Sequence, residues 1–430
     1  MEIIKSVFPY YLCLKKQLMK ILEVLTYYRP WISGLTIYVE RLSKALVAQG
    51  HDVTVLTAQY DPSLPRYDVI DGVKIIRVPV AMRVSKGVIM PEFGPMAWKL
   101  SRDADVIHLH LPQFDAPGVA LRGRLMNKPV VLTYHCDLQL PPGAFNQLVN
   151  RVVLTMNNLA GLLADAVVTY TRDYGTHSPF LAQYLDKKLY IIPPPVTLAP
   201  CSVAEAAQFY NQHQLNGHEV IGFVSRLATE KGVEVLLKAL PKIWQEFSNV
   251  RVLHAGPYKD ILGEEAYRKR VLPVIESYGD KYQLLGPIEG AELTAFYKSL
   301  DVLTIPSLNS TESFGLVQIE AMRNNVPVAA CALPGVRQPV TMTGMGAVTA
   351  VGDHEALADA IIDILRDKKK YQRDSELIKQ SFDPMQTAVE YIKLFNDLRR
   401  GTFAPKTTEP PVYDELRAMR DAYVNKEISA

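Results

Sequence analysis

Short runs of β-branched and other apolar residues alternate with longer stretches of helical periodicity along most of the chain. In the first half these runs predict strands at residues 20–26, 52–57, 74–80, 105–110, 130–135, 166–170 and 189–192. The stretch 38–49 carries apolar residues at helical spacing and ends before Gly50, which predicts a helix. Strands that are apolar throughout and are joined through helices are typical of a parallel sheet covered on both faces.

The same alternation restarts after a run of three prolines, Pro193 to Pro195, which interrupts regular structure. It predicts further strands at residues 219–224, 250–255, 282–285, 302–306 and 326–330, with helices between them. We therefore expect an α/β fold of two doubly wound, Rossmann-like domains. Open α/β sheets bind ligands at the carboxyl ends of their strands, so the expected site is a central cleft that both domains face.

The pattern also predicts where the parts of the chain begin and end. Residues 1–18 precede the first strand and are expected to be an N-terminal appendage, followed by domains at 19–195 and 196–382. A helix at 383–400 either ends the second domain or crosses back to the first. The prolines at the start of the tail, residues 401–430, argue against a packed element there, although a short charged helix can follow them.

Composition narrows the class of protein. The chain has 430 residues, 48% apolar and 21% charged, which is typical of a globular protein and excludes a mainly disordered or coiled-coil chain. Its four cysteines lie far apart and form neither a disulfide framework nor a metal-ligand spacing, so we expect a reducing compartment and no structural metal. No apolar run approaches the roughly 20 residues that a membrane span needs.

Charge is divided unevenly between the two halves. Residues 1–195 carry 21 Lys and Arg against 15 Asp and Glu, a net +6, and the remainder carries 26 against 30, a net −4. A basic first half suits an anionic membrane surface or an anionic acceptor, although scattered cations also form ordinary solvated faces. No zinc-finger or RRM-type sequence occurs, so nucleic acid is not an expected partner.

The strongest chemical signal is a pair of glutamates, Glu312 and Glu320, around the sequence Ser-Phe-Gly-Leu. On one helix they would lie about two turns apart on roughly one face. If the helix instead begins near Gly315, Glu312 lies in the preceding loop, and the amides of Phe314, Gly315 and Leu316 can meet ligand oxygens. The alternative is an exposed acid pair at the start of a helix.

Cations follow the first strand of the second domain. Arg226 and Lys231 lie on the expected strand-to-helix loop, where guanidinium and ammonium groups can grip a diphosphate. In the first domain Gly34 follows the first strand and would allow close approach of a ligand phosphate, which is a weak signal by itself. The fingerprints G-x-G-x-x-G and G-x-x-x-x-G-K-[ST] do not occur.

A histidine ends the fifth predicted strand. His135, followed two residues later by Asp137, is expected to point into the cleft, where its imidazole can bond a substrate hydroxyl. A structural role is the alternative for a single histidine in this position. His108 and His110, also at a strand end, are expected to be packing or rim residues.

Together these motifs, in this order, resemble the retaining glycosyltransferases of family 4, which have the two-domain GT-B fold. The resemblance covers about residues 19–400. It implies that residues 19–195 bind the acceptor and 196–382 a nucleoside diphosphate sugar, with no metal and no cofactor. It assigns the ribose to Glu320, the diphosphate to Arg226 and Lys231, and the donor sugar to Glu312 and the amides of residues 314–316. Ile288 matches the stretch that lines the base in such enzymes.

Two positions depart from the family pattern. Gly34 is followed by Leu35 where paired glycines are common, which is expected to crowd the acceptor side of the cleft. Three prolines stand where the family often has Pro-Asn-Gly-Val, which is expected to stiffen the hinge.

The expected activity is therefore transfer of a hexosyl group from a nucleoside diphosphate sugar to an acceptor hydroxyl, with retention at the anomeric carbon and without a metal. The implied mechanism is attack on the same face, assisted by the departing phosphate. The acceptor is a glycan, a lipid-linked molecule or a small molecule. A nucleotide-sugar hydrolase or epimerase of the same fold, and a catalytically silent sugar-nucleotide-binding subunit, are the alternatives.

The expected location is cytoplasmic, with peripheral membrane contact to reach a lipid-linked acceptor. The candidate contact is the segment 145–163, whose leucines and Val152 fall near one helical face alongside Arg151. The alternative is that this face packs on its own sheet.

Overall fold

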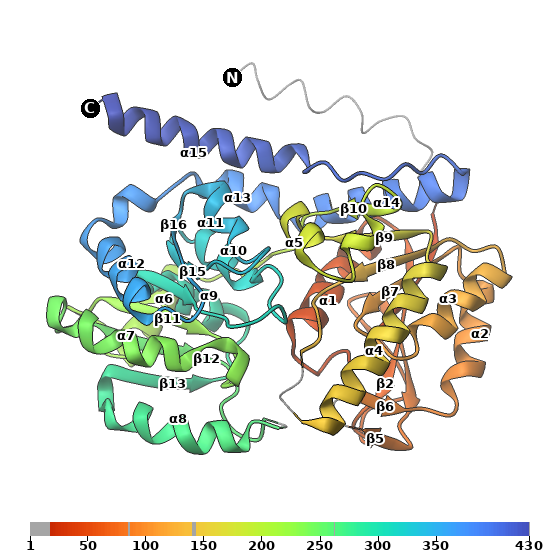
Figure 1. Cartoon of the computed structure of the whole chain (residues 1–430), viewed down its shortest axis with the longest axis horizontal. Helices are drawn as coiled ribbons and strands as arrows, with labels where there is room; N and C mark the ends of the chain where they lie inside the picture. The colour runs from red at the N-terminus through yellow and green to blue at the C-terminus, as the bar shows by residue number, and fades with distance from the viewer. Residues whose placement is uncertain (1–17, 85–86, 140–142, 262, 430) are drawn as a thin grey trace.

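Two α/β domains, each built on a mainly parallel sheet, lie side by side in the computed structural model (Figure 1). The structure describes residues 18–84, 87–139, 143–261 and 263–429. Nearly all of the expected N-terminal appendage, residues 1–17, lies outside the described residues. The predicted fold class, two Rossmann-like domains, is confirmed.

The first sheet has eight strands in the order β10-β9-β8-β7-β1-β2-β4-β3, and all neighbours are parallel except β3 and β4. A separate hairpin joins β5 and β6. The strands are β1 (Lys20–Val24), β2 (Asp52–Gln59), β3 (Tyr67–Ile70), β4 (Val73–Pro79), β5 (Met82–Val84), β6 (Gly87–Ile89), β7 (Val106–Leu111), β8 (Val130–Tyr134), β9 (Ala166–Thr169) and β10 (Leu189–Ile191). The helices are α1 (Gly34–Ala48), α2 (Phe93–Asp103), α3 (Ala116–Leu125), α4 (Ala144–Leu163) and α5 (Arg172–His177).

The second sheet has six parallel strands in the order β13-β12-β11-β14-β15-β16. They are β11 (Val220–Val224), β12 (Arg251–Ala255), β13 (Tyr282–Gly286), β14 (Val302–Ile305), β15 (Val328–Cys331) and β16 (Gly346–Thr349). The helices are α6 (Val203–Gln212), α7 (Val233–Glu246), α8 (Glu265–Ser277), α9 (Gly290–Lys298), α10 (Leu316–Met322), α11 (Gln338–Thr343), α12 (His354–Arg366) and α13 (Ser375–Ser381).

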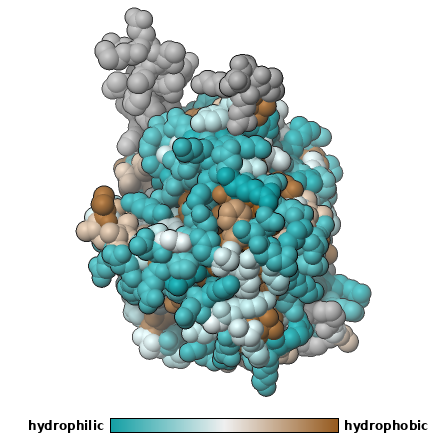
Figure 2. All heavy atoms as spheres, turned by 90° about the vertical axis from the view of Figure 1, so that its left-hand side faces the viewer, coloured by the Kyte–Doolittle hydropathy of each residue, from teal (hydrophilic) through white to brown (hydrophobic). Residues whose placement is uncertain are grey.

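Successive residues of the central strands pack into different cores, as expected for a sheet covered on both faces. In β1, Ile21 belongs to the core that α1 shares with the second domain, whereas Leu22 and Val24 belong to the core beneath α2 and α3. All six residues of β7 are buried. The outer face of the second domain is mostly hydrophilic, with apolar residues in small separate groups (Figure 2).

The C-terminal helices join the two domains. Helix α14 (Pro384–Arg400) packs against α1 of the first domain, and the hydroxyls of Tyr391 and Tyr38 lie 2.7 Å apart. Helix α15 (Pro411–Ser429) contacts α11 and α13 of the second domain, and its Tyr413 hydroxyl donates to the carbonyl of Tyr170 at 2.9 Å.

The expectation that the tail lacks a packed element is wrong. Tyr413 and Leu416 on α15 are fully buried, and Val412 and Met419 pack against the same core. Pro411 is the first residue of the helix, a position where proline needs no hydrogen-bond partner, so the prolines that suggested a loop only mark the start of the helix.

The sequence pattern missed four short strands. β3, β5, β6 and β16 each have three or four residues, and most of these residues are exposed or only partly buried. A short strand with little buried surface carries no clear apolar run. Within the described residues no helix combines the length and apolar character needed to cross a bilayer.

Candidate active site

The loops that follow β11 and β14 meet at the carboxyl ends of these neighbouring strands. The ammonium of Lys231 lies 2.6 Å from a carboxylate oxygen of Glu312, and both side chains are about four-fifths buried. A small pocket here is lined by Phe223, Val224, Ser225, Lys231, Thr304, Ile305, Ser307 and Glu312. The structure therefore brings together two predicted site residues that are 81 positions apart in the sequence.

A glycine makes this approach of the two loops possible. Gly232 has a left-handed backbone (φ 71°), and a Cβ at this position would lie 2.0 Å from the carbonyl oxygen of Pro306. Any other residue would push the two loops apart. The loop is also closed by Glu230, whose side chain pairs with Arg226 and whose carbonyl accepts from the amide of Leu308 at 2.8 Å.

The two glutamates lie on different kinds of structure. α10 begins at Leu316, directly after Gly315 in a left-handed conformation (φ 76°), so Glu312 is in the preceding loop and Glu320 is on the helix. The sequence allowed two arrangements, with both glutamates on one helix or with Glu312 in the preceding loop. The structure has the second. The side chain of Phe314 is buried and packs edge-on against Tyr170 of the first domain at 6.0 Å.

Glu320 is nearly buried and is held from two directions. One carboxylate oxygen lies 2.6 Å from a guanidinium nitrogen of Arg41 on α1, and the other accepts from the hydroxyl of Tyr297 at 2.7 Å. A carboxylate can accept about four hydrogen bonds, so these two partners leave further acceptor capacity on Glu320. No sequence motif pointed to Arg41, because its partner comes from the other domain.

Further contacts join the domains around the pocket. The hydroxyl of Ser313 donates to the carbonyl of His135, and the amide of Asp137 donates to the carbonyl of Ser310 at 3.2 Å. Asp173 on α5 accepts two hydrogen bonds from Arg337, at 2.6 and 2.9 Å. The loop after β8 therefore lies directly against the Glu312 loop.

Comparison with known proteins fits this arrangement. A family model described as "Glycosyl transferase 4-like domain" matches residues 33–182, and one described as "Glycosyl transferases group 1" matches residues 207–380. The chain belongs to the group 1 glycosyltransferases. These are retaining enzymes of the GT-B fold that transfer a sugar from a nucleotide-sugar donor.

Several relatives cover most of this glycosyltransferase. A phosphatidyl-myo-inositol mannosyltransferase of Mycobacterium leprae is 28% identical over 77% of this chain and 84% of its own. A glycogen synthase of Mycobacterium tuberculosis is 27% identical over 93% of this chain and 99% of its own. Among solved structures, Anabaena HepE in complex with UDP and glucose has a TM-score of 0.70 at 20% identity, covering 88% of this chain and 99% of that chain.

His135 is placed differently from the expectation. One ring nitrogen lies 3.0 Å from His110 and the other is hydrogen-bonded to the hydroxyl of Tyr170, so the ring is buried and both nitrogens are already paired within the protein. Burial lowers the pKa of His135 well below its usual range, which keeps the ring neutral. In this conformation the glycosyltransferase offers no imidazole nitrogen of His135 to a substrate hydroxyl.

A buried acid explains the orientation of this ring. Glu23 on β1 lies 2.9 Å from His108 and 2.6 Å from His110. Burial alone raises the pKa of Glu23, but the two histidines outweigh it and hold this pKa at about 2. His110 therefore donates to Glu23 and accepts from His135, which in turn accepts from Tyr170.

Among the described residues, Glu23, His108 and His110 form the group that could hold a metal ion. The ligating atoms of Glu23, His108 and His110 lie within 4.8 Å of one another. Metal-ligand spacing could not be recognised in the sequence, because Glu23 is 85 positions before His108. In the structure one carboxylate oxygen of Glu23 pairs with both imidazoles, and the other is buried without a hydrogen-bond partner among the described residues.

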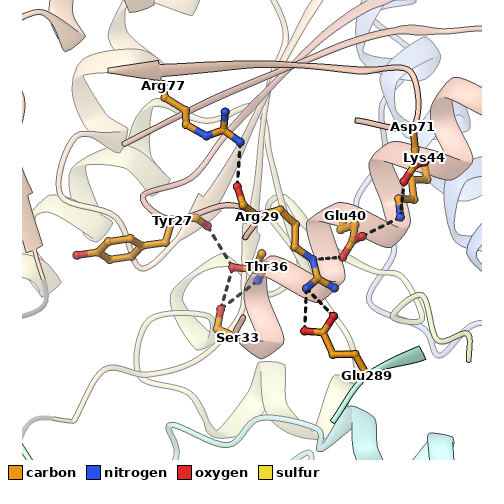
Figure 3. Close-up of polar contacts among 9 residues, drawn as sticks. All are labelled: Tyr27, Arg29, Ser33, Thr36, Glu40, Lys44, Asp71, Arg77 and Glu289. Atoms are coloured by element: carbon orange, nitrogen blue, oxygen red, sulfur yellow. Dashed lines mark hydrogen bonds and ion pairs between the residues drawn. The ribbon is translucent and has the colours of Figure 1, made fainter. Parts of the chain in front are cut away.

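The loop before α1 reaches the second domain through Arg29, which lies beside Glu289 (Figure 3). Ser33 caps α1 by accepting from the amide of Thr36 at 3.2 Å. Arg29 lies 2.6 Å from Glu40 and 3.3 Å from Glu289, which follows Ile288 in the second domain. The predicted base-lining residue Ile288 thus lies next to a contact between the domains.

Gly34 and Leu35 differ in what they face. No atom lies within 4 Å of the position that a Cβ of Gly34 would take, so packing does not require a glycine there, and the space beside it is open. The side chain of Leu35 packs against the core that α1 shares with the second domain. Part of the Leu35 side chain is therefore committed to this core, and its expected crowding of the acceptor side stays a prediction.

Proposed function

We propose that this enzyme transfers a hexosyl group from a nucleoside diphosphate sugar to a hydroxyl of an acceptor ring, without a metal. Residues 196–382 would bind the donor and residues 19–195 the acceptor. The observation that carries the proposal is the Lys231–Glu312 pair in the pocket at the ends of β11 and β14. An ammonium held here can face the diphosphate, while the adjacent carboxylate faces the hydroxyls of the sugar.

The charges around the pocket suit this reaction. As the bond to the sugar breaks, negative charge grows on the diphosphate, and Lys231 and Arg226 are cations fixed in place by their ion pairs. Glu312 and the amides of residues 314–316 would hold the donor sugar, Glu320 the ribose, and Ile288 the base. The departing phosphate would then accept the proton of an acceptor that attacks from the same face.

The names of two relatives bear on the acceptor. One name refers to phosphatidyl-myo-inositol and the other to glycogen. Both of these molecules contain six-membered polyhydroxylated rings. We therefore propose a ring hydroxyl as the attacking group. The ring could be free, part of a glycan or attached to a lipid. In each case the attacking atom is the oxygen of a ring hydroxyl.

Titration with UDP-glucose and GDP-mannose by calorimetry, followed by product analysis, tests the function. We expect one donor to bind and the product to retain the anomeric configuration by NMR. Release of free sugar at a rate that no acceptor increases would indicate a hydrolase. Formation of an isomerised nucleotide sugar would indicate an epimerase. Tight binding without any turnover would indicate a silent subunit.

The outer face of α4 supports peripheral contact with a membrane. Leu148 and Leu162 are 57% and 63% exposed, and Val152 and Leu159 on the same face are also exposed. Only Leu163 packs against the core of the first domain. The alternative that this face packs on its own sheet is therefore wrong for four of its five apolar residues.

Neighbouring residues extend this face. Leu121 and Leu125 on α3, which packs beside α4, are also exposed, and Arg124 and Arg151 are exposed on the two helices. We propose that this apolar and basic face rests on an anionic bilayer and brings the cleft to a lipid-linked acceptor. A cytoplasmic location fits the free thiols of Cys136, Cys201 and Cys331.

Co-sedimentation with vesicles tests this contact. At low salt we expect the protein to pellet with phosphatidylglycerol vesicles and to remain in solution with phosphatidylcholine vesicles. The double variant Leu148→Ser, Leu162→Ser should lose this binding, whereas Val203→Ser, at an exposed apolar residue of the second domain, should keep it. Equal recovery in solution with both vesicles would refute the membrane proposal.

A further inference from the structure

A cluster of aromatic side chains lies beyond the carboxyl ends of two neighbouring strands of the first domain. Tyr27 and Trp31 come from the loop after β1, and Tyr60 follows the end of β2. β1 pairs in parallel with both β2 and β7, so the loops after all three strands leave the same edge of the sheet. Gln113, two residues after β7, therefore belongs to the same row of loops.

The three rings support one another. The rings of Tyr27 and Trp31 are stacked with centroids 4.8 Å apart, and Tyr60 meets Trp31 edge-on at 5.4 Å. Trp31 is 41% exposed although two tyrosines pack against it. An indole that is fixed by neighbouring rings but open to solvent is a preorganised surface for a ligand.

The backbone beneath the cluster is also fixed (Figure 3). The hydroxyl of Thr36 donates to the carbonyl of Tyr27 at 3.2 Å, and the guanidinium of Arg77 donates to the carbonyl of Arg29 at 3.0 Å. A ligand that stacks on Trp31 would therefore have little loop to order on binding.

Gln113 provides an independent sign of a ligand. Its side chain is only 2% exposed, and within the described residues neither the amide nitrogen nor the amide oxygen has a hydrogen-bond partner. A buried amide without partners costs free energy, so such a group calls for a partner that can both donate and accept. A hydroxyl does both.

The cations near this loop are already engaged within the protein. Arg29 is paired with Glu40 and Glu289, the buried Arg77 with Asp68, and the guanidinium of Arg83 donates to the carbonyl of Tyr60. The groups that can still contact a ligand are the indole face of Trp31, which suits the C–H groups of a ring, and the side-chain amide of Gln113, which suits its hydroxyls. Both match a six-membered polyol, such as a sugar or a cyclitol.

We propose that Tyr27, Trp31 and Tyr60 form the acceptor subsite, that it takes a six-membered ring polyol stacked on Trp31, and that Gln113 bonds its hydroxyls. This proposal rests on the proposed glycosyl transfer. Trp31 and Gln113 determine which acceptor binds, and the donor site in the other domain is independent of them.

Kinetics with defined acceptors test the subsite. The probes are myo-inositol, methyl α-glucoside, methyl α-mannoside and maltose, with sorbitol as an open-chain polyol, each with the donor found by calorimetry. We expect at least one ring probe, and not sorbitol, to be glycosylated. Trp31→Ala should raise the KM for that probe about tenfold, since a lost aromatic contact and its buried area amount to roughly 1.4 kcal/mol. Trp31→Phe should raise it less.

Two further variants separate binding from folding. Trp98→Phe changes another exposed tryptophan of the same domain, on α2, and should leave the KM unchanged. Gln113→Leu removes an unpaired buried amide, so it should keep or raise the melting temperature and yet lower kcat/KM for the ring probe at least tenfold. A merely structural Gln113 would leave kcat/KM unchanged.

Several results would overturn the proposal. Donor binding without glycosylation of any ring probe, equal use of sorbitol, or a KM for Trp31→Ala within twofold of the wild-type value would each show that the cluster is not a ring subsite. Failure of both donors to bind would instead contradict the proposed function. Donor affinity should be unchanged in all four variants, and its loss in Trp31→Ala would likewise overturn the assignment to the acceptor.

Discussion

Replacement of Lys231 by methionine removes the cation of the proposed donor pocket and keeps much of the side-chain volume. The lost ammonium lies 2.6 Å from Glu312, and the two side chains are 20% and 19% exposed. Two unit charges about 4 Å apart interact by about 4 kcal/mol at an effective dielectric constant of about 20, which sets the scale for Lys231 against the departing diphosphate. Because Glu312 shares the ammonium, we expect a loss of about 3 kcal/mol, or roughly 100- to 1000-fold in kcat/KM.

The effect on folding should be smaller. Glu312 is 19% exposed and loses a charged hydrogen bond, so we expect the free energy of unfolding to fall by about 2 kcal/mol. The assay is the initial rate of donor consumption, with urea denaturation of the same samples. Lys242→Met is the matched control, because Lys242 pairs with Asp359 at 2.6 Å on the outer surface of the same domain and its loss should leave kcat/KM within twofold. A folded Lys231→Met enzyme with kcat/KM within threefold of the wild-type value would refute the role of Lys231.

Three further predictions follow from the site and its surroundings. Glu320→Gln should weaken binding of the donor nucleotide about 10- to 100-fold by calorimetry, since a charged hydrogen bond contributes about 1.5–3 kcal/mol, and unchanged affinity would remove its assignment to the ribose. Incubation with EDTA should leave activity intact, and activity that is lost and then returns with magnesium or manganese would contradict the metal-free mechanism. Burial lowers the pKa of His110 and of His254 to about 4 from 6.5, so the unfolded chain binds more protons between these values. Stability should therefore be complete above pH 6.5 and fall by about 2 kcal/mol for each histidine at pH 5, and equal urea midpoints at pH 7 and pH 5 would contradict this.

Local pattern was enough to predict most of the fold. The long strands of both sheets are buried on both faces, so their apolar runs are visible in the sequence, as in β7 and β8. Edge strands such as β3 and β16 bury little and leave no such run. The sequence allowed for a short charged helix in the tail, but the packing of α15 was missed because prolines precede it, and because the surface that buries Tyr413 is formed by distant segments.

For the site, the sequence by itself determined which residues are candidates for donor chemistry, because Arg226, Lys231, Glu312 and Glu320 follow a family pattern of residue types and spacing. Only the tertiary structure decided which groups meet. It pairs Lys231 with Glu312 and Arg41 with Glu320, turns the ring of His135 toward His110 and Tyr170, and leaves Trp31 exposed on its supporting rings. The physical reason is that spacing along the chain constrains neighbours only within a few residues, whereas these contacts join loops of different strands and domains.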